Sequence, residues 1–275
     1  MADIAIVVSD DCGPDSTAAE ELVRSYRDPR LMYVRNEQNL GLAGNWNRCL
    51  RVAPTDLVTI FHADDRLLPH YASMMLDAAE CHQSAAAFYC DVTIINEASQ
   101  PTFSFPDFYK KLIRKRAKDK GAVVLRGDGA LASLMHGWYV MCPTICYRRS
   151  RLGPREFSGD WRMVVDVDFI ASLLLDGEEL IGLPHIAYQY RRHSANQTSV
   201  LTNELTRFVE ESRIHDRLAA QATALGWEMT PGVAKAKRII RFNLAYCIVR
   251  DLTALRPRYA GRKARLLGEM VWKKA

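Results

Sequence analysis

Apolar and polar positions alternate with two different periods over the first hundred residues. Short apolar runs bounded by Gly, Pro or Asp predict buried strands at residues 4–8, 31–34, 57–61 and 86–95. Between them, apolar residues recur at helical spacing and predict helices at residues 18–26, 46–52 and 69–81. This alternation is typical of an α/β fold with a mostly parallel sheet. In such a sheet, ligands bind at the carboxyl ends of the strands.

The alternation stops at residues 99–121. This segment carries four aromatic residues between positions 103 and 109, followed by a basic run at residues 110–118. Three interpretations of the basic run stay open: an active-site lid, a nucleic-acid patch, or the solvated face of a helix. The chain then continues with a helix at 129–135, a strand at 143–147, a helix at 166–175 and a strand at 186–190, and it is mostly helical from residue 203.

The composition predicts a folded soluble protein. Of the 275 residues, 48% are hydrophobic and 25% are charged, which is close to the globular average. The seven cysteines do not form the two closely spaced pairs of a zinc site, which favours reduced thiols and a cytoplasmic location. The first residues lack the basic character of a signal peptide, and no apolar run reaches the roughly 18 residues that a membrane span needs.

Positive charge is concentrated towards the C-terminal end. Residues 231–275 carry twelve Lys or Arg and two acidic residues, or +10, so the rest of the chain carries −5 of the total +5. Residues 233–255 interleave apolar and basic positions, as amphipathic helices do that bind a membrane surface. The alternative is a helix that packs on the protein and exposes a basic face. No recognition motif accompanies the charge, so we expect no nucleic-acid partner.

Two adjacent carboxylates follow the strand predicted at residues 57–61. Asp64 and Asp65 end a buried run, where unpaired negative charge is costly. Mg²⁺ or Mn²⁺ would compensate for this charge, because both ions prefer oxygen ligands and often share them with phosphates. The alternative is that Asp65 caps the following helix.

Four further segments accompany this pair in a fixed order. They are Asp10-Asp11, Asn39-Leu40-Gly41-Leu42-Ala43-Gly44, Val165-Asp166-Val167-Asp168 and Tyr190-Arg191-Arg192-His193. Together with His62-Ala63-Asp64-Asp65, they resemble the family-two glycosyltransferases, inverting enzymes of the GT-A fold. The resemblance covers residues 4–199. It implies a GT-A domain, Rossmann-like with a mostly parallel sheet and flanking helices, at residues 1–200, and a helical basic C-terminal extension at residues 201–275.

The resemblance also implies a role for each segment. Asp166 would be the general base that takes the proton of the acceptor hydroxyl. The metal ion, Mg²⁺ or Mn²⁺, would be bound by Asp65, Asp64 and His193. The nucleotide-sugar donor would be bound by Asp10, Asp11, Asn39, Gly41, Asp64, Arg191 and His193. Plain alternatives stay open: an Asx turn for Asp10 and Asp11, and a helix N-cap for Asp166.

Several neighbouring residues depart from the family pattern or have two interpretations. Val165 stands where relatives carry an acid. His62, which also replaces an acid, is expected to pack, the alternative being a hydrogen bond to a phosphate. Asp168 cannot share a helix face with Asp166, because residues two apart on a helix face different ways, so it is expected to act as a cap or a support. Trp138 and Trp161 either flank the acceptor or pack in the core.

The resemblance begins at the family's second strand. We expect that the first strand and helix were lost by truncation, the alternative being a degenerate relative, and that a strand edge is left unpaired. The implied function is transfer of a sugar from a nucleotide-diphosphate donor to a glycan or lipid-linked acceptor, in the synthesis of a cell-surface polysaccharide or glycan at the inner face of the membrane. The competing hypothesis is a non-catalytic relative that binds a membrane or a partner through its basic tail.

Overall fold

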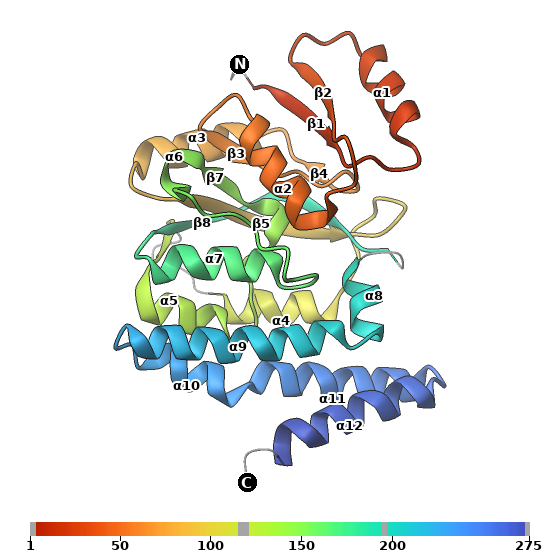
Figure 1. Cartoon of the computed structure of the whole chain (residues 1–275), viewed down its shortest axis with the longest axis vertical. Helices are drawn as coiled ribbons and strands as arrows, with labels where there is room; N and C mark the ends of the chain where they lie inside the picture. Colours follow the sequence, from red (N-terminus) through yellow and green to blue (C-terminus); the bar gives the residue numbers. More distant parts are fainter. Residues whose placement is uncertain (1–3, 115–120, 194–196, 273–275) are drawn as a thin grey trace.

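The N-terminal strands form a small sheet of their own. The computed structural model describes residues 4–114, 121–193 and 197–272. In it, β1 (Ile6–Asp10) pairs in parallel with β2 (Leu31–Arg35), and α1 (Ser16–Ser25) connects them. This unit lies at one end of the molecule (Figure 1). Among the described strands, β1 pairs only with β2, so one of its edges is unpaired.

The main sheet contains six strands of mixed direction. Its order is β3 (Leu57–Thr59), β7 (Cys146–Arg148), β5 (Ala87–Ile95), β8 (Leu180–Arg191) and β4 (Arg66–Leu67), with β6 (Val123–Leu125) also paired to β8. Within the described part of this sheet only the β5–β8 pair is parallel. The α/β fold is therefore confirmed, and the mostly parallel pairing is corrected to a mixed one.

The three strands β3, β5 and β8 nevertheless point in the same direction, because β7 is antiparallel to both β3 and β5 and β8 is parallel to β5. Their carboxyl ends share one edge of the sheet. Residues 60–65 link β3 at one end of the strand order to β4 at the other. This segment is not fully extended, because it contains a turn in which the Asp65 N–H donates to the His62 backbone oxygen at 3.2 Å. It passes the carboxyl ends of β5 and β8, where the Arg191 guanidinium donates to the backbone oxygens of both Asp64 and Asn96.

The side chains of β5 alternate between two cores. Ala87 and Tyr89 face the larger core, and Phe88 and Cys90 face the smaller core beneath α3 (Tyr71–Cys81). The larger core is formed with α2 (Gly41–Val52), α5 (Gly127–Leu134), α7 (Val165–Leu175) and α9 (Thr206–Ala224). Because helices cover both faces, β5 has apolar residues on both sides.

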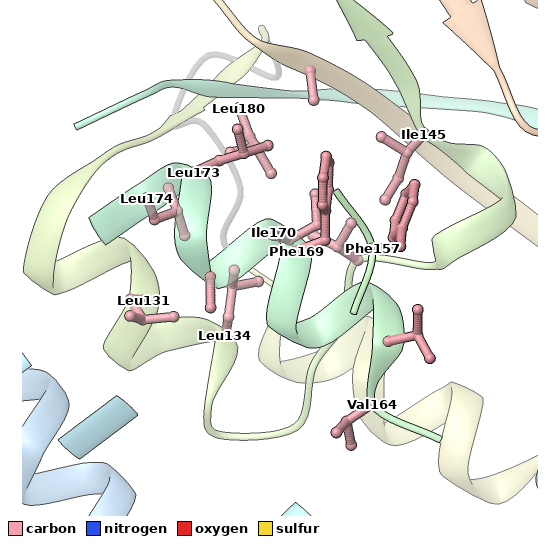
Figure 2. Close-up of a cluster of buried hydrophobic side chains, with 14 of the residues drawn as sticks. Leu131, Leu134, Ile145, Phe157, Val164, Phe169, Ile170, Leu173, Leu174 and Leu180 are labelled. Carbon is pink, nitrogen blue, oxygen red and sulfur yellow. The ribbon is translucent and has the colours of Figure 1, made fainter. Parts of the chain in front are cut away.

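Helix α7 lies inside the larger core. Figure 2 shows Phe169, Ile170, Leu173 and Leu174 on it, with Leu131 and Leu134 of α5 nearby. Phe169 stacks on Phe157, with 4.1 Å between ring centroids. A helix that is apolar on all sides is normally enclosed, and this enclosure fixes the position of the first turn of α7.

The C-terminal helices stack below the sheet in layers (Figure 1). They are α8 (Gln197–Asn203), α9, α10 (Met229–Ala236), α11 (Arg238–Thr253) and α12 (Pro257–Trp272). Ile214 and Leu218 of α9 belong to the larger core, whereas α11 and α12 pack together around a separate cluster that includes Leu244 and Leu266. The segment predicted as a helical extension thus shares a core with the sheet. Within the described residues, no helix is both long and apolar enough to cross a membrane.

Shorter elements complete the fold. They are α4 (Phe105–Ile113) in the segment that interrupts the alternation, a 3-10 turn (Cys142–Thr144), and α6 (Arg149–Leu152). The strand predicted at 143–147 is replaced by the turn and β7, because Pro143 has no N–H for a sheet ladder. Of the predicted basic run, residues 115–118 lie outside the described residues.

Candidate active site

One large cavity opens at the shared carboxyl ends of β3, β5 and β8. Its volume is about 1210 Å³, somewhat above the usual range of small-molecule sites. Its walls come from residues 60–65, the end of β8, the first turn of α7, and helices α4 and α11. Asp64, His193 and Asp166 all line it, so the structure brings a predicted metal ligand pair and the predicted base into one cavity.

Asp65 is the buried member of the carboxylate pair. One of its oxygens accepts the Tyr188 hydroxyl at 2.9 Å, and the other accepts the Arg191 backbone N–H at 2.7 Å. Burial raises the pKa of Asp65 to about 6, although both hydrogen bonds act to lower it. Each oxygen keeps a further lone pair, so Asp65 can still bind a cation while β8 holds it in place. The N-cap of α3 is His70, so the alternative that Asp65 caps this helix is wrong.

Asp64 is the more exposed member of the pair and faces His193, with 3.0 Å between its carboxylate oxygen and Nε2. His62 joins the group, since ligand atoms of His62, Asp64 and Asp65 all lie within 4.8 Å of one another. Two carboxylates with imidazole nitrogens suit Mn²⁺ or Mg²⁺. This donor set therefore fits the metal that the sequence predicted.

His62 has both a packing role and a free nitrogen. Its ring stacks on Trp46 at 5.7 Å between centroids, which agrees with the predicted packing. Its Nε2 is buried and has no hydrogen-bond partner within the described residues. Burial lowers the pKa of His62, which favours the neutral imidazole that binds metals.

The two arginines that end β8 have different surroundings. The Arg191 guanidinium donates to the backbone oxygens of Asp64, Asn96 and Glu97 at 2.6 to 3.0 Å. Arg191 therefore positions the carboxylate loop rather than lining the cavity. Arg192 does line the cavity, where its Nη2 and Nε atoms donate to the two carboxylate oxygens of Asp107 in α4 at 2.9 and 3.2 Å.

Asp166 lies in the first turn of α7 and is half-buried in the cavity wall. Burial raises its pKa to about 6, although the nearby Lys110 acts to lower it. Lys110 of α4 lines the same cavity, and burial lowers its pKa in turn. A carboxylate with a pKa near 6 is ionised at neutral pH and basic enough to accept a proton from a reacting hydroxyl. The N-cap of α7 is Val164, so the helix-cap alternative for Asp166 is wrong.

Glu210 of α9 holds the segment that leads into α7. Its buried carboxylate accepts the backbone N–H groups of Arg162 at 3.1 Å and Met163 at 2.8 Å, and that of Val164 at 3.4 Å. A carboxylate at this position also interacts favourably with the dipole of α7. The C-terminal helices thus fix the backbone next to the candidate base.

Of the other residues singled out near Asp166, Asp168 and Trp161 lie in the core and Trp138 lines the cavity. Asp168 is buried, accepts the Trp161 indole N–H at 3.0 Å and pairs with Arg217. Both Asp168 and Trp161 therefore have structural roles. Trp138 instead lines the cavity, so it remains a candidate for the acceptor side.

The donor-binding residues predicted near the N-terminus lie at the carboxyl end of β1 and around the start of α2. Asp10 accepts the Ser16 hydroxyl at 2.6 Å and the Tyr33 hydroxyl at 2.7 Å. It also accepts the Cys12 backbone N–H at 2.8 Å, which closes the expected Asx turn.

Asp11 joins the two loops of this sheet. One of its oxygens accepts the Asn36 side-chain amide at 2.9 Å and the Leu40 backbone N–H at 2.7 Å. Asn39 accepts the Gly41 N–H at 3.0 Å, and Gly41 has a φ of +70°, which favours glycine. Asp10, Asp11, Asn39 and Gly41 do not line the large cavity, and their donor-binding role stays a prediction.

Three residues at the site escaped the sequence-based prediction. Tyr188 binds Asp65, Asp107 binds Arg192, and Glu210 holds the entry to α7. A tyrosine near the end of a strand, or an acid within a helix, has no local signature. Lys110 also lines the cavity, and the sequence did point to it, because it lies in the basic run for which an active-site lid was one interpretation.

The sequence has recognisable relatives. The model of the family described as glycosyl transferase family 2 matches residues 2–133. The uncharacterized protein MT1568 of Mycobacterium tuberculosis is 29% identical over 195 residues, which are 69% of this chain and 58% of that protein. The putative colanic acid biosynthesis glycosyl transferase WcaA of Escherichia coli is 24% identical over 117 residues, 40% of this chain and 42% of WcaA. The chain thus spans about half the length of these relatives.

Solved structures share the fold. A crystal structure of S. aureus TarS 1–349 in complex with UDP-GlcNAc has a TM-score of 0.62 at 15% identity, covering 87% of this chain and 64% of that one. The mannosyltransferase PcManGT from Pyrobaculum calidifontis, in complex with GDP-Man and Mn²⁺, has a TM-score of 0.54 at 17% identity, covering 98% and 79%. These similarities agree with the GT-A fold. Residues 2–133 therefore resemble glycosyl transferase family 2, and the fold around them is similar to that of these two solved structures.

Proposed function

We propose that this chain transfers a sugar from a nucleotide-diphosphate donor to a hydroxyl acceptor, with inversion at the anomeric carbon. The observation that carries the proposal is the cavity that contains both the Asp64–His193 group and the separate carboxylate Asp166. The Asp64–His193 group suits the binding of a diphosphate with its cation, and Asp166 is placed to act as a general base. The relative WcaA supports a place in the synthesis of a cell-surface polysaccharide or glycan.

Asp64, Asp65 and His193 would hold Mg²⁺ or Mn²⁺, with His62 close by. When bound, this ion neutralises the negative charge that develops on the leaving diphosphate. The hydrogen bonds from Tyr188 and from the Arg191 backbone keep Asp65 oriented. The guanidinium of Arg191 holds the backbone of Asp64, so β8 sets the geometry of both carboxylates.

Asp166 would remove the proton from the acceptor hydroxyl as its oxygen attacks the sugar. Inversion needs a single base on the side of the acceptor, opposite the leaving diphosphate. Lys110, Cys142 and Tyr147 interact electrostatically with Asp166. Lys110 stabilises the ionised carboxylate. Burial raises the pKa of the Cys142 thiol and of the Tyr147 hydroxyl, so both groups stay protonated at neutral pH and do not accept the proton.

A ligand-dependent stability assay tests the proposal. Thermal unfolding would be followed with UDP or GDP, each with and without Mn²⁺. The melting temperature should rise only when the nucleotide and the ion are both present, because ligands that bind the folded state stabilise it. Asp65→Ala should abolish this shift, whereas Asp166→Asn should keep the shift and lose sugar transfer.

Two outcomes would contradict the assignment. If no nucleoside diphosphate changes the melting temperature, the chain does not bind a donor, and a non-catalytic relative explains it better. If Asp166→Asn loses the nucleotide shift, Asp166 belongs to the donor site and is not the base.

A further inference from the structure

One side of α11 is both apolar and exposed. Five of its exposed positions follow one another at intervals of three or four, so they share a single helix face. They are Arg238, Phe242, Ala245, Val249 and Leu252; Arg250 and Thr253 are exposed as well. The residues buried on the opposite face are Ile240, Leu244, Cys247 and Asp251. Within the described residues, the core of the protein leaves Ala245, Val249 and Leu252 of this face exposed.

Helix α4 extends this surface. Phe105 stacks on Tyr246 at 5.4 Å between ring centroids, and Tyr109 stacks on Phe242 at 5.7 Å. None of the residues of α4 is fully buried, and Phe108 and Leu112 are exposed. We call the resulting surface the docking face, and it consists of Phe105, Phe108, Leu112, Phe242, Val249 and Leu252.

The docking face is continuous with the cavity. Phe105 and Phe242 line the cavity together with Asp166 and His193. The wall of the cavity on this side is therefore formed by α4 and α11. Lys110 and Asp107 lie on α4 as well, so the helix that carries exposed Phe108 also contributes charged groups to the site.

The charges around the docking face are positive. Arg238 begins the exposed side of α11, Arg256 follows the helix, and Lys111 lies between Phe108 and Leu112 on α4. Residues 231–275 as a whole carry a net charge of +10. An apolar face bordered by Lys and Arg matches a surface that is negatively charged outside and apolar within. A second copy of the chain would instead bring two positive borders together, which is unfavourable.

We propose that the docking face binds the surface of a bilayer that contains anionic lipids. Phe108, Leu112, Val249 and Leu252 insert between the lipid headgroups, and the surrounding Lys and Arg contact their phosphates. The cavity then takes an acceptor with an apolar chain from the bilayer, a step that rests on the proposed glycosyl transfer. The docking face differs from the sequence-based expectation, because it combines α4 with α11 rather than using the basic tail alone.

Vesicle sedimentation tests the proposal without donor, metal or acceptor. The full chain should sediment with vesicles of phosphatidylglycerol and phosphatidylcholine, and much less with phosphatidylcholine alone. High salt should weaken the binding, since it screens the charges. Val249→Ser and Phe108→Ser should each weaken binding about tenfold, because each removes an inserted apolar side chain.

Leu22→Ser on α1 is the matched control, because Leu22 is 60% exposed and Val249 is 61% exposed. This variant should bind vesicles like the unchanged protein, and all three variants should keep the melting temperature of the unchanged protein. Leu252→Ser replaces any variant that loses stability. The proposal is overturned if anionic vesicles do not bind, if Val249→Ser and Phe108→Ser bind normally, or if these substitutions instead dissociate a dimer in solution. The nucleotide-induced stability shift would survive each of these failures, so it reports on the glycosyl transfer separately.

Discussion

Removing the Glu210 carboxylate should destabilise the protein and slow catalysis together. This side chain is only 6% exposed, and it accepts three backbone N–H groups at the entry to α7. Glu210→Ala leaves these N–H groups buried without a partner. The change therefore acts on the backbone that precedes Asp166, although Glu210 itself does not line the cavity.

The magnitude follows from the hydrogen bonds that are lost. A hydrogen bond to a charged group contributes about 1.5–3 kcal/mol. Three N–H groups that share one carboxylate do not add fully, so we expect Glu210→Ala to lower the free energy of unfolding by about 3–5 kcal/mol. For a chain of this size that corresponds to a fall in melting temperature of roughly 10 °C.

Urea unfolding measures the change in stability, and steady-state kinetics measures its effect on transfer. We expect kcat to fall while the KM of the donor stays close to its original value. The substitution does not change the residues that we propose bind the diphosphate. Glu204→Ala is the matched control. Glu204 also faces Arg162, but as a half-exposed ion pair at 3.6 Å, which contributes about 1 kcal/mol or less. If Glu210→Ala destabilises the protein no more than Glu204→Ala, the hydrogen bonds of Glu210 do not support α7.

Two further predictions concern ionisation in the cavity. Because the pKa of Asp166 is raised to about 6, kcat should rise with pH through about 6 and then stay level; a rate that is constant from pH 5 to 8 would exclude Asp166 as the base. Between about pH 4 and 6, Asp166 keeps its proton in the folded protein but has lost it in the unfolded chain. The free energy of unfolding contributed by Asp166 should therefore decrease as pH rises through this range. Urea unfolding of Asp166→Asn should lack this decrease. Tyr188→Phe removes a hydrogen bond from buried Asp65 and should weaken Mn²⁺ binding roughly tenfold at pH 7 in a thermal-shift titration, whereas equal affinity would mean that Tyr188 only packs.

The sequence predicted the elements that are long and strongly periodic. Strand β5, helix α3 and helix α7 were all expected close to their observed positions, because their apolar spacing extends over two or more turns or over a full strand. Strands β4 and β6 have two and three residues, which is too short for any period. The mixed direction of the sheet depends on these short strands and on β7, so it could not be predicted either.

The site shows a similar division. Asp64, His193 and Asp166 were predicted from ordered motifs, and they do line one cavity. The sequence could not distinguish Arg191 from Arg192, because neighbouring residues at the end of a strand point to opposite sides. It also could not find Glu210, whose partner Met163 is 47 positions away. Contacts over such separations are made by packing of α9 against the core, and no local pattern records them.

The enclosure of α7 between the sheet and α9 has a consequence for how this chain could be divided. Residues 2–133 match the family and contain Asp64 and Asp65, but Asp166, His193 and the α11 wall of the cavity all lie after them. The proposed diphosphate site is therefore assembled from both parts of the chain, because Asp64 and Asp65 precede residue 133 and His193 follows it. Exchanging the residues after 133 between relatives should disturb the nucleotide-dependent stability shift as well as the use of acceptor. A cut at residue 200 would not produce an independent module either, because it separates Asp166 from the helix that keeps it in place.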